Sequence, residues 1–167
     1  MKRQTRTRAA IATAAALVAA GTVTVGVSAA GPESKSTKPT KAQIAALFDG
    51  WNSALQTGDA ETVADRYASD AVLLPTVSPE IRTDRAGIVD YFEHFLANKP
   101  QGKKIRTVVN VLDSNSAIDA GLYEFTLTDP ETGEKREVEA RYTYEYEKRG
   151  GKWLIVNHHS SVLPAAG

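Results

Sequence analysis

The C-terminal residues 135–162, KREVEARYTYEYEKRGGKWLIVNHHSSV, carry the clearest secondary-structure signal in the chain. Apolar and polar residues alternate through most of this stretch, and the glycine pair Gly150-Gly151 interrupts the alternation. A period of two is typical of β-strands, and adjacent glycines are typical of a tight turn. The stretch therefore predicts two long antiparallel strands, over residues 135–148 and 152–162.

Two further strands are expected immediately upstream. Residues 103–112 and 117–126 are rich in β-branched and other apolar side chains. Asp113–Asn115 supplies a turn between them, and Asp129–Gly133 supplies a hairpin turn before the long strands. Four strands joined by short turns predict an antiparallel meander.

The period changes to that of a helix in the preceding residues. A capping box at Thr40 opens a helix that stops at Gly58. A short helix begins at Asp59, a brief strand covers 71–74, and a third helix covers 84–97. Helices followed by a run of strands predict an α+β fold, in which a curved antiparallel sheet wraps around three N-terminal helices.

Residues 1–30 are predicted to be a secretory signal peptide. Four basic residues precede the uncharged stretch Ala9–Ala30, which ends in small residues. This order is typical of a signal peptide, and it predicts cleavage after Ala29 or Ala30 and secretion to the extracellular side. The alternative is an uncleaved N-terminal membrane anchor.

The remaining residues have the composition of a globular domain with a short tether. Residues 31–40 are expected to be a disordered linker, and 41–164 the folded domain. Because all four basic residues of 1–30 are removed with the signal, the 20 basic and 20 acidic residues become 16 and 20, a net charge of −4. A mildly acidic domain disfavours nucleic acid as a partner, and no membrane contact is expected after cleavage. The chain has no cysteine, which excludes disulfides and thiolate–metal sites.

Several short motifs resemble one superfamily. Trp51–Asp59, Tyr67–Ala71 and Tyr91-Phe92 are similar to motifs of the cone-shaped nuclear-transport-factor-2-like superfamily. Glu147–Trp153 followed by Val156–Ser161 resembles the association (hub) domain of calcium/calmodulin-dependent protein kinase II, and especially its stand-alone bacterial relatives, the SgcJ/EcaC family. The resemblance covers essentially the whole domain and implies a cone-like fold, self-association through the sheet and an internal pocket. The matching residues contain no kinase domain, so kinase activity and calmodulin binding do not follow.

One predicted face of the long strands, together with the helices above it, supplies the candidate ligand-binding residues. They are Trp51, Tyr91, Tyr142, Tyr144, His158 and Ser160. The resemblance implies arginines in the pocket of the hub domain, and Tyr144 and Ser160 stand at two of those positions here. A pocket without fixed positive charge favours a small neutral or aromatic ligand over a carboxylate. If His158 contacts the ligand, binding is expected to depend on pH, because an unperturbed imidazole titrates near pH ~6.5. The alternative is that these side chains only fill the core.

The opposite face of the same strands is expected to be an interface. Strict alternation places Thr143, Trp153 and Ile155 together on it. A contiguous apolar patch is disfavoured in water. The face therefore predicts a homodimer or a higher oligomer packed sheet to sheet.

The three histidines do not predict a metal site. His158 and His159 are neighbours on a strand and point to opposite faces, so they cannot share an ion. His94 lies off the apolar stripe of its helix. Neither a metal nor a cofactor is expected.

The leading interpretation is a secreted, oligomeric domain that binds a small molecule or serves assembly. The runner-up is a SnoaL/SgcJ-like enzyme acting on a small organic or polyketide-like substrate, with His158 as acid/base and Tyr144 as hydrogen-bond donor. A third possibility is a pure protein-interaction module. Against an isomerase mechanism, the resemblance places the general-base position on Leu74 or Pro75, neither of which accepts a proton.

Overall fold

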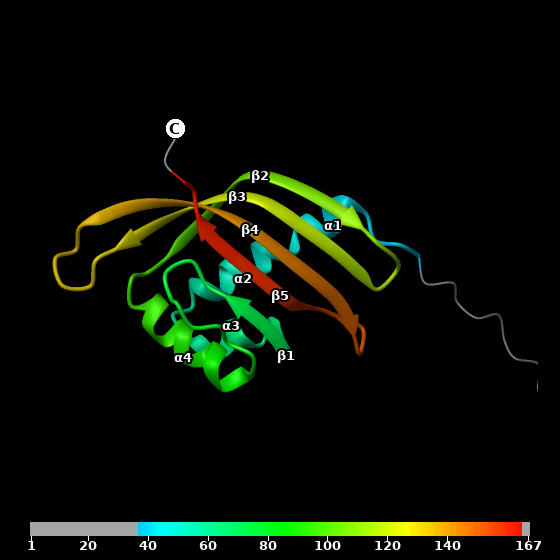
Figure 1. The fold of residues 1–167 in the computed structure, drawn as a ribbon, viewed down its shortest axis with the longest axis horizontal. Coiled ribbons are helices and arrows are strands. Elements are labelled where there is room, and N and C mark those ends of the chain that lie inside the picture. Colours follow the sequence, from blue (N-terminus) through cyan, green and yellow to red (C-terminus); the bar gives the residue numbers. More distant parts are fainter. Residues whose placement is uncertain (1–36, 165–167) are drawn as a thin grey trace, which may run out of the picture. The chain divides into compact units, whose positions relative to one another are not determined.

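The computed structural model describes residues 37–164, and these form an α+β domain built on one five-stranded sheet (Figure 1). In chain order the elements are α1 (Lys41–Ala45), α2 (Leu47–Leu55), α3 (Ala60–Ala64), β1 (Tyr67–Leu74), α4 (Arg85–Leu96), β2 (Gln101–Val111), β3 (Ser116–Thr128), β4 (Lys135–Arg149) and β5 (Lys152–Val162). The predicted signal peptide and most of the predicted linker lie outside the described residues. Within 37–164 no helix is long and apolar enough to cross a membrane.

The sheet has the strand order β1-β5-β4-β3-β2. The predicted meander is confirmed, because β2, β3, β4 and β5 pair antiparallel in sequence order. The short first strand adds a pair that the sequence did not reveal: β1 runs parallel to β5, with Leu73 opposite His158. In Figure 1 the green β1 and the red β5 lie side by side, although they come from opposite ends of the domain.

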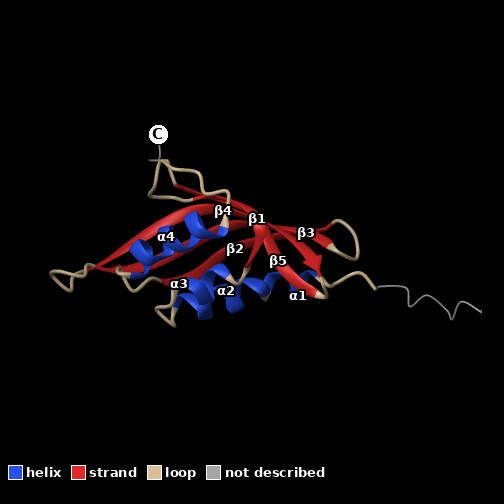
Figure 2. Ribbon diagram, turned by 90° about the horizontal axis from the view of Figure 1, so that it is seen from below, coloured by secondary structure: helices blue, strands red, loops and turns tan. Residues whose placement is uncertain are grey.

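The helices pack against one face of the sheet (Figure 2), and α1, α3 and α4 each begin at a residue whose side chain caps the helix. The Thr40 capping box is present, since the Thr40 side chain accepts from the Gln43 amide at 3.2 Å and the Gln43 side chain accepts from the Thr40 amide at 2.8 Å. The predicted first helix is broken at Ala46 into α1 and α2, so four helices take the place of three in the described residues. At the break, Lys104 of β2 donates to the Ala45 carbonyl at 2.5 Å.

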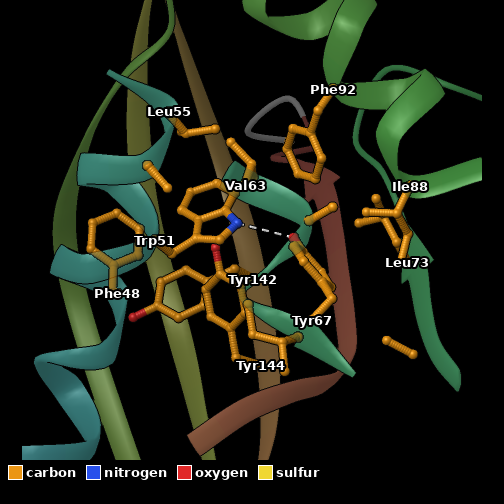
Figure 3. Close-up of a cluster of buried hydrophobic side chains, with 14 of the residues drawn as sticks. Phe48, Trp51, Leu55, Val63, Tyr67, Leu73, Ile88, Phe92, Tyr142 and Tyr144 are labelled. Carbon is orange, nitrogen blue, oxygen red and sulfur yellow. Dashed lines mark hydrogen bonds between the residues drawn. The ribbon is translucent and has the colours of Figure 1, made fainter. Parts of the chain in front are cut away.

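The core lies between these helices and the sheet face that carries Tyr142 and Tyr144, here called the inner face. Trp51 sits at its centre and is 2% exposed. The Trp51 indole donates to the Tyr67 hydroxyl at 3.0 Å, the contact drawn as a dashed line in Figure 3. Phe92 of α4 meets the Trp51 ring edge to face, so helices from both halves of the helical region converge on one indole.

Two β-bulges break the strict alternation within the antiparallel strands β2–β5. The first inserts Ile105 into β2, between the residues that pair with Tyr123 and Leu122. The second inserts Val156 into β5, because Glu145 pairs with Asn157 and Tyr146 pairs with Ile155. An extra residue on one strand exchanges the two faces on either side of it.

The second bulge corrects the sequence-based assignment of the outer face. Ile155, predicted to lie outside with Thr143, is 2% exposed and belongs to the core. Trp153 lies opposite Lys148 and is half-buried against the same core. Thr143 does lie on the outer face, next to the exposed His159. The prediction failed because it applied a period of two across residue 156.

Candidate functional site

A narrow cavity opens between α4, the segment after β1 and the inner face of the sheet. Its volume of about 30 Å³ is enough for about two water molecules. Aromatic and aliphatic side chains form most of its wall, and the polar groups come from β5, β3 and residue 76. No carboxylate, lysine or arginine lines the cavity within the described residues.

His158 carries the first polar group of the cavity. The side chain is 4% exposed, and its Nδ1 lies 2.9 Å from the Tyr67 hydroxyl. Because the Tyr67 oxygen already accepts from the Trp51 indole, its own proton is free to go to Nδ1. That assignment leaves the proton of neutral His158 on Nε2, and this buried N–H has no partner in the described part of the chain.

The imidazole of His158 stays neutral over the physiological range. Burial, with a smaller contribution from the nearby His159, lowers the pKa of His158 to about 3. The expected titration near pH 6.5 is therefore wrong, since desolvation disfavours the imidazolium. His158 therefore remains a neutral hydrogen-bond donor near pH 7. It is a poor general acid or base at that pH.

A chain of hydroxyls forms the second polar group. The Tyr123 hydroxyl donates to Ser160 Oγ, and Ser160 Oγ contacts Thr76 Oγ1. Burial raises the pKa of Tyr123 to about 12, so the phenol is a permanent donor. Sequence reasoning missed Tyr123, although its position on β3 has the same parity as the apolar Phe125 and Leu127, which is the signal that would have placed it on the inner face.

The structure brings four of the six predicted ligand-binding residues to the cavity: Trp51, Tyr91, His158 and Ser160. The other two lie in the core beside it. Tyr144 stacks on His158 with ring centroids 4.2 Å apart, and is fully buried. Tyr142 turns toward β2 and β3, where its hydroxyl lies 3.1 Å from Thr107 Oγ1.

The Tyr142 hydroxyl also contacts a buried carboxyl group, which was not predicted from the sequence. Asp119 of β3 is 0% exposed, and its Oδ1 accepts from the Tyr142 hydroxyl at 3.1 Å. Its Oδ2 has no hydrogen-bond partner in the described residues. Burial raises the pKa of Asp119 to about 6. The alternation of β3 could have placed Asp119 on the inner face, because it shares the parity of the buried Ala117 and Tyr123.

The other two histidines lie away from the inner cavity. His159 is exposed on the outer face, and the His94 side chain is 80% exposed on α4. Among residues 37–164 no group of three His, Asp or Glu side chains is placed to hold a metal ion.

Comparisons with known proteins agree on one family. The sequence model of the calcium/calmodulin dependent protein kinase II association domain matches residues 40–164. A crystal structure from Xanthomonas campestris, described as a candidate association domain of this kinase, is 58% identical; the match covers 74% of this chain and 88% of that one, with a TM-score of 0.73. No curated protein gives a significant match.

More distant structures share the fold. The association domain of the kinase from C. elegans is 15% identical over 73% of this chain and 96% of that chain, with a TM-score of 0.58. A candidate dehydratase of the NTF2-like family from Streptomyces avermitilis is also 15% identical, over 74% and 96% of the two chains, with a TM-score of 0.66. At these identities the likeness shows the cone-like fold alone.

Proposed function

This chain belongs to the calcium/calmodulin dependent protein kinase II association domain family, and from that premise we propose that it is a self-associating domain that holds a small uncharged molecule in its inner cavity. The observation that carries the ligand proposal is the buried N–H at His158 Nε2, which has no partner in the described residues. An unsatisfied buried donor costs about 1–3 kcal/mol, and a ligand acceptor removes that cost. The cavity wall offers no charge to balance an ion, so the acceptor belongs to a neutral molecule.

Benzamide and benzoate test this proposal, because they share a shape and differ in charge. Benzamide is expected to raise the melting temperature, whereas benzoate is expected to leave it unchanged, because a buried carboxylate finds no cation. The benzamide effect is expected to stay constant from pH 5 to 8, since a His158 pKa of about 3 leaves the imidazole neutral throughout.

The variant His158→Phe is expected to abolish the benzamide effect, because it keeps a ring and removes the donor. His159→Phe is the matched control, since His159 is exposed and lines neither hollow, and it is expected to behave as the unchanged protein. Stronger stabilisation by benzoate than by benzamide would contradict the proposal.

The outer face of the sheet supports the proposal of self-association. Two arginines, Arg106 and Arg141, flank Leu122 in one row of paired residues across β2, β3 and β4. The neighbouring row contains Lys103, Glu124 and Glu139, so two glutamates lie directly opposite each other beside one lysine, and the row is here called the glutamate row. Within residues 37–164 neither arginine has a carboxylate within 4.0 Å. A second copy related by a twofold axis can bring the arginine row of one subunit to the glutamate row of the other.

A charge exchange on β4 tests this interface. Arg141→Glu and Glu139→Arg are each expected to weaken self-association by about tenfold, because each places like charges together. The double variant is expected to recover most of the loss. Light scattering over a micromolar dilution series measures the effect, and Lys135→Glu, at the start of β4, is the control. Equal dissociation constants for all variants would show that the interface does not involve this face of the sheet.

Export is the remaining part of the proposal. The charged start and the uncharged stretch Ala9–Ala30 support a cleaved signal peptide. Sequencing of the mature N-terminus from the culture medium is expected to begin at Ala30 or Gly31. An intact Met1 recovered in a membrane fraction would instead support the anchor.

Catalysis does not form part of the proposal. An acid/base role for His158 requires a pKa near neutrality, and burial moves that pKa to about 3. The described cavity wall contains no carboxylate to replace it.

A further inference from the structure

The inner cavity is smaller than any organic ligand of the proposed class. Its volume of about 30 Å³ admits about two water molecules, and benzamide has nine non-hydrogen atoms. If the domain holds such a molecule, part of the wall must move. The structure shows which part is least firmly held.

The wall on one side of the cavity separates it from a larger hollow. Val77, Tyr91 and Phe95 line both spaces. The outer hollow has a volume of about 330 Å³, and Ser78, Arg82, Asp90, His94 and Asn98 complete its lining. Tyr91 and Phe95 are fixed on α4, where their rings stack 5.7 Å apart. Val77 lies on a segment outside the helices and strands, and it is 58% exposed.

The segment that carries Val77 is anchored at its ends. Leu73 and Arg82 exchange two backbone hydrogen bonds, of 2.8 and 2.9 Å, which hold the two ends of the segment together. Arg82 also contacts Asp90 of α4 at 3.2 Å. Between the ends, the contact of Thr76 with Ser160 is the hydrogen bond that ties the segment to the sheet, among the side-chain bonds of the described residues. Ile81, 59% exposed, is a second apolar side chain turned to solvent.

We propose that Thr76–Ile81 is a lid, and that the inner cavity and the outer hollow are two halves of one ligand site. When the lid leaves Ser160, the hydroxyls of Ser160 and Tyr123 become free for a ligand, and Val77 no longer divides the two spaces. The inference rests on the proposed function and names its ligand class: an elongated uncharged aromatic molecule. An oxygen at its inner end accepts from His158 Nε2, and an uncharged polar group lies at its outer end.

The charges of the outer hollow argue against an anionic outer end. Arg82 is its cation, and Glu80 and Asp90 both contact the Arg82 guanidinium. Two carboxylates against one guanidinium leave no net positive charge for an anionic ligand. The molecule 4-(hydroxymethyl)benzamide has the required form, and it is expected to bind severalfold more tightly than benzamide.

A reversible disulfide tests the lid. The chain has no cysteine, so Thr76→Cys/Ser160→Cys creates a single possible bond between two side chains that are already in contact. Trp51 lines the cavity and reports binding by fluorescence once the second tryptophan is removed by Trp153→Phe. Because Ser160→Cys removes one ligand hydroxyl, the reduced variant is expected to bind benzamide more weakly than the Trp153→Phe protein, through the His158 Nε2 donor that remains. Oxidation is expected to weaken binding at least about tenfold further, and dithiothreitol is expected to restore the affinity of the reduced variant.

Thr76→Val provides an independent test without a cross-link. It keeps the shape of the lid and removes its hydrogen bond, so the closed state is destabilised and benzamide affinity is expected to rise by about fivefold. Equal binding by oxidised and reduced protein, or no gain in Thr76→Val, overturns the lid and leaves the proposed function intact. Failure of the unchanged protein to bind either amide overturns the proposed function as well.

Discussion

Gly121→Ala is expected to destabilise the domain by about 3 kcal/mol or more, among the largest effects of any single methyl group in this structure. A Cβ atom at Gly121 would lie 1.8 Å from the carbonyl oxygen of Arg106. The contact is with backbone, which cannot rotate away, and it lies beside the bulge at Ile105 where β2 bends over β3. The expected loss corresponds to a fall in melting temperature of roughly 10 °C or more.

Gly50→Ala is the matched control for this prediction. Gly50 lies inside α2, and a Cβ there meets only the end of the flexible Arg66 side chain, at 3.5 Å. Alanine in a helix interior is expected to stabilise by about 0.5–1 kcal/mol relative to glycine. Urea unfolding followed by circular dichroism measures both variants. A loss below about 1 kcal/mol in Gly121→Ala would show that the bulge is not where the pairing of β2 and β3 places it.

Asp119→Asn is expected to stabilise the protein at pH 8 by about 2 kcal/mol and to have no effect near pH 4. The folded pKa of about 6 lies above the ordinary value of 3.8, so the folded state holds the proton more tightly than the unfolded chain. Stability from this group is therefore complete below the unfolded pKa and is lost as the pH rises through about 6. Asparagine is uncharged at every pH, and its oxygen can still accept from Tyr142.

Unfolding free energies at half-unit steps from pH 4 to pH 8 measure the Asp119 prediction. Asp70→Asn is the control of opposite sign, because the contact with Arg149 lowers the pKa of the exposed Asp70. That variant is expected to give no gain at pH 8. Parallel curves for the unchanged protein and Asp119→Asn would mean that the carboxyl group is not buried as the structure has it.

The strands and helices were predictable because their signals are long and local. The alternation in 135–148 and the helical spacing in 84–97 each extend over several turns or pleats, so one misread residue changes little. The break at Ala46 was not predictable from spacing, since the donor that the Ala45 carbonyl meets there, Lys104, lies far along the chain. The parallel pairing of β1 with β5 likewise depends on which sheet edge remains free, which no local pattern encodes.

The candidate site was predictable in composition and not in shape. Parity placed His158 and Ser160 on the inner face correctly, because both lie on the same side of the bulge at Val156. The same rule failed for Ile155, on the other side of that residue. The pKa of His158 follows from burial in three dimensions, and the cavity size follows from the packing of α4 and residue 76, so neither could be read from the sequence.

The pairing of the first strand with the last has a consequence for the order of events during synthesis. β1 is complete at Leu74, and its partner ends at Val162, so the ribosome makes more than half of the domain before this edge of the sheet can form. The Tyr67–His158 contact likewise can form only after β5 has been made. Contacts of such sequence separation form late, so this edge of the sheet closes only after β5 has been made.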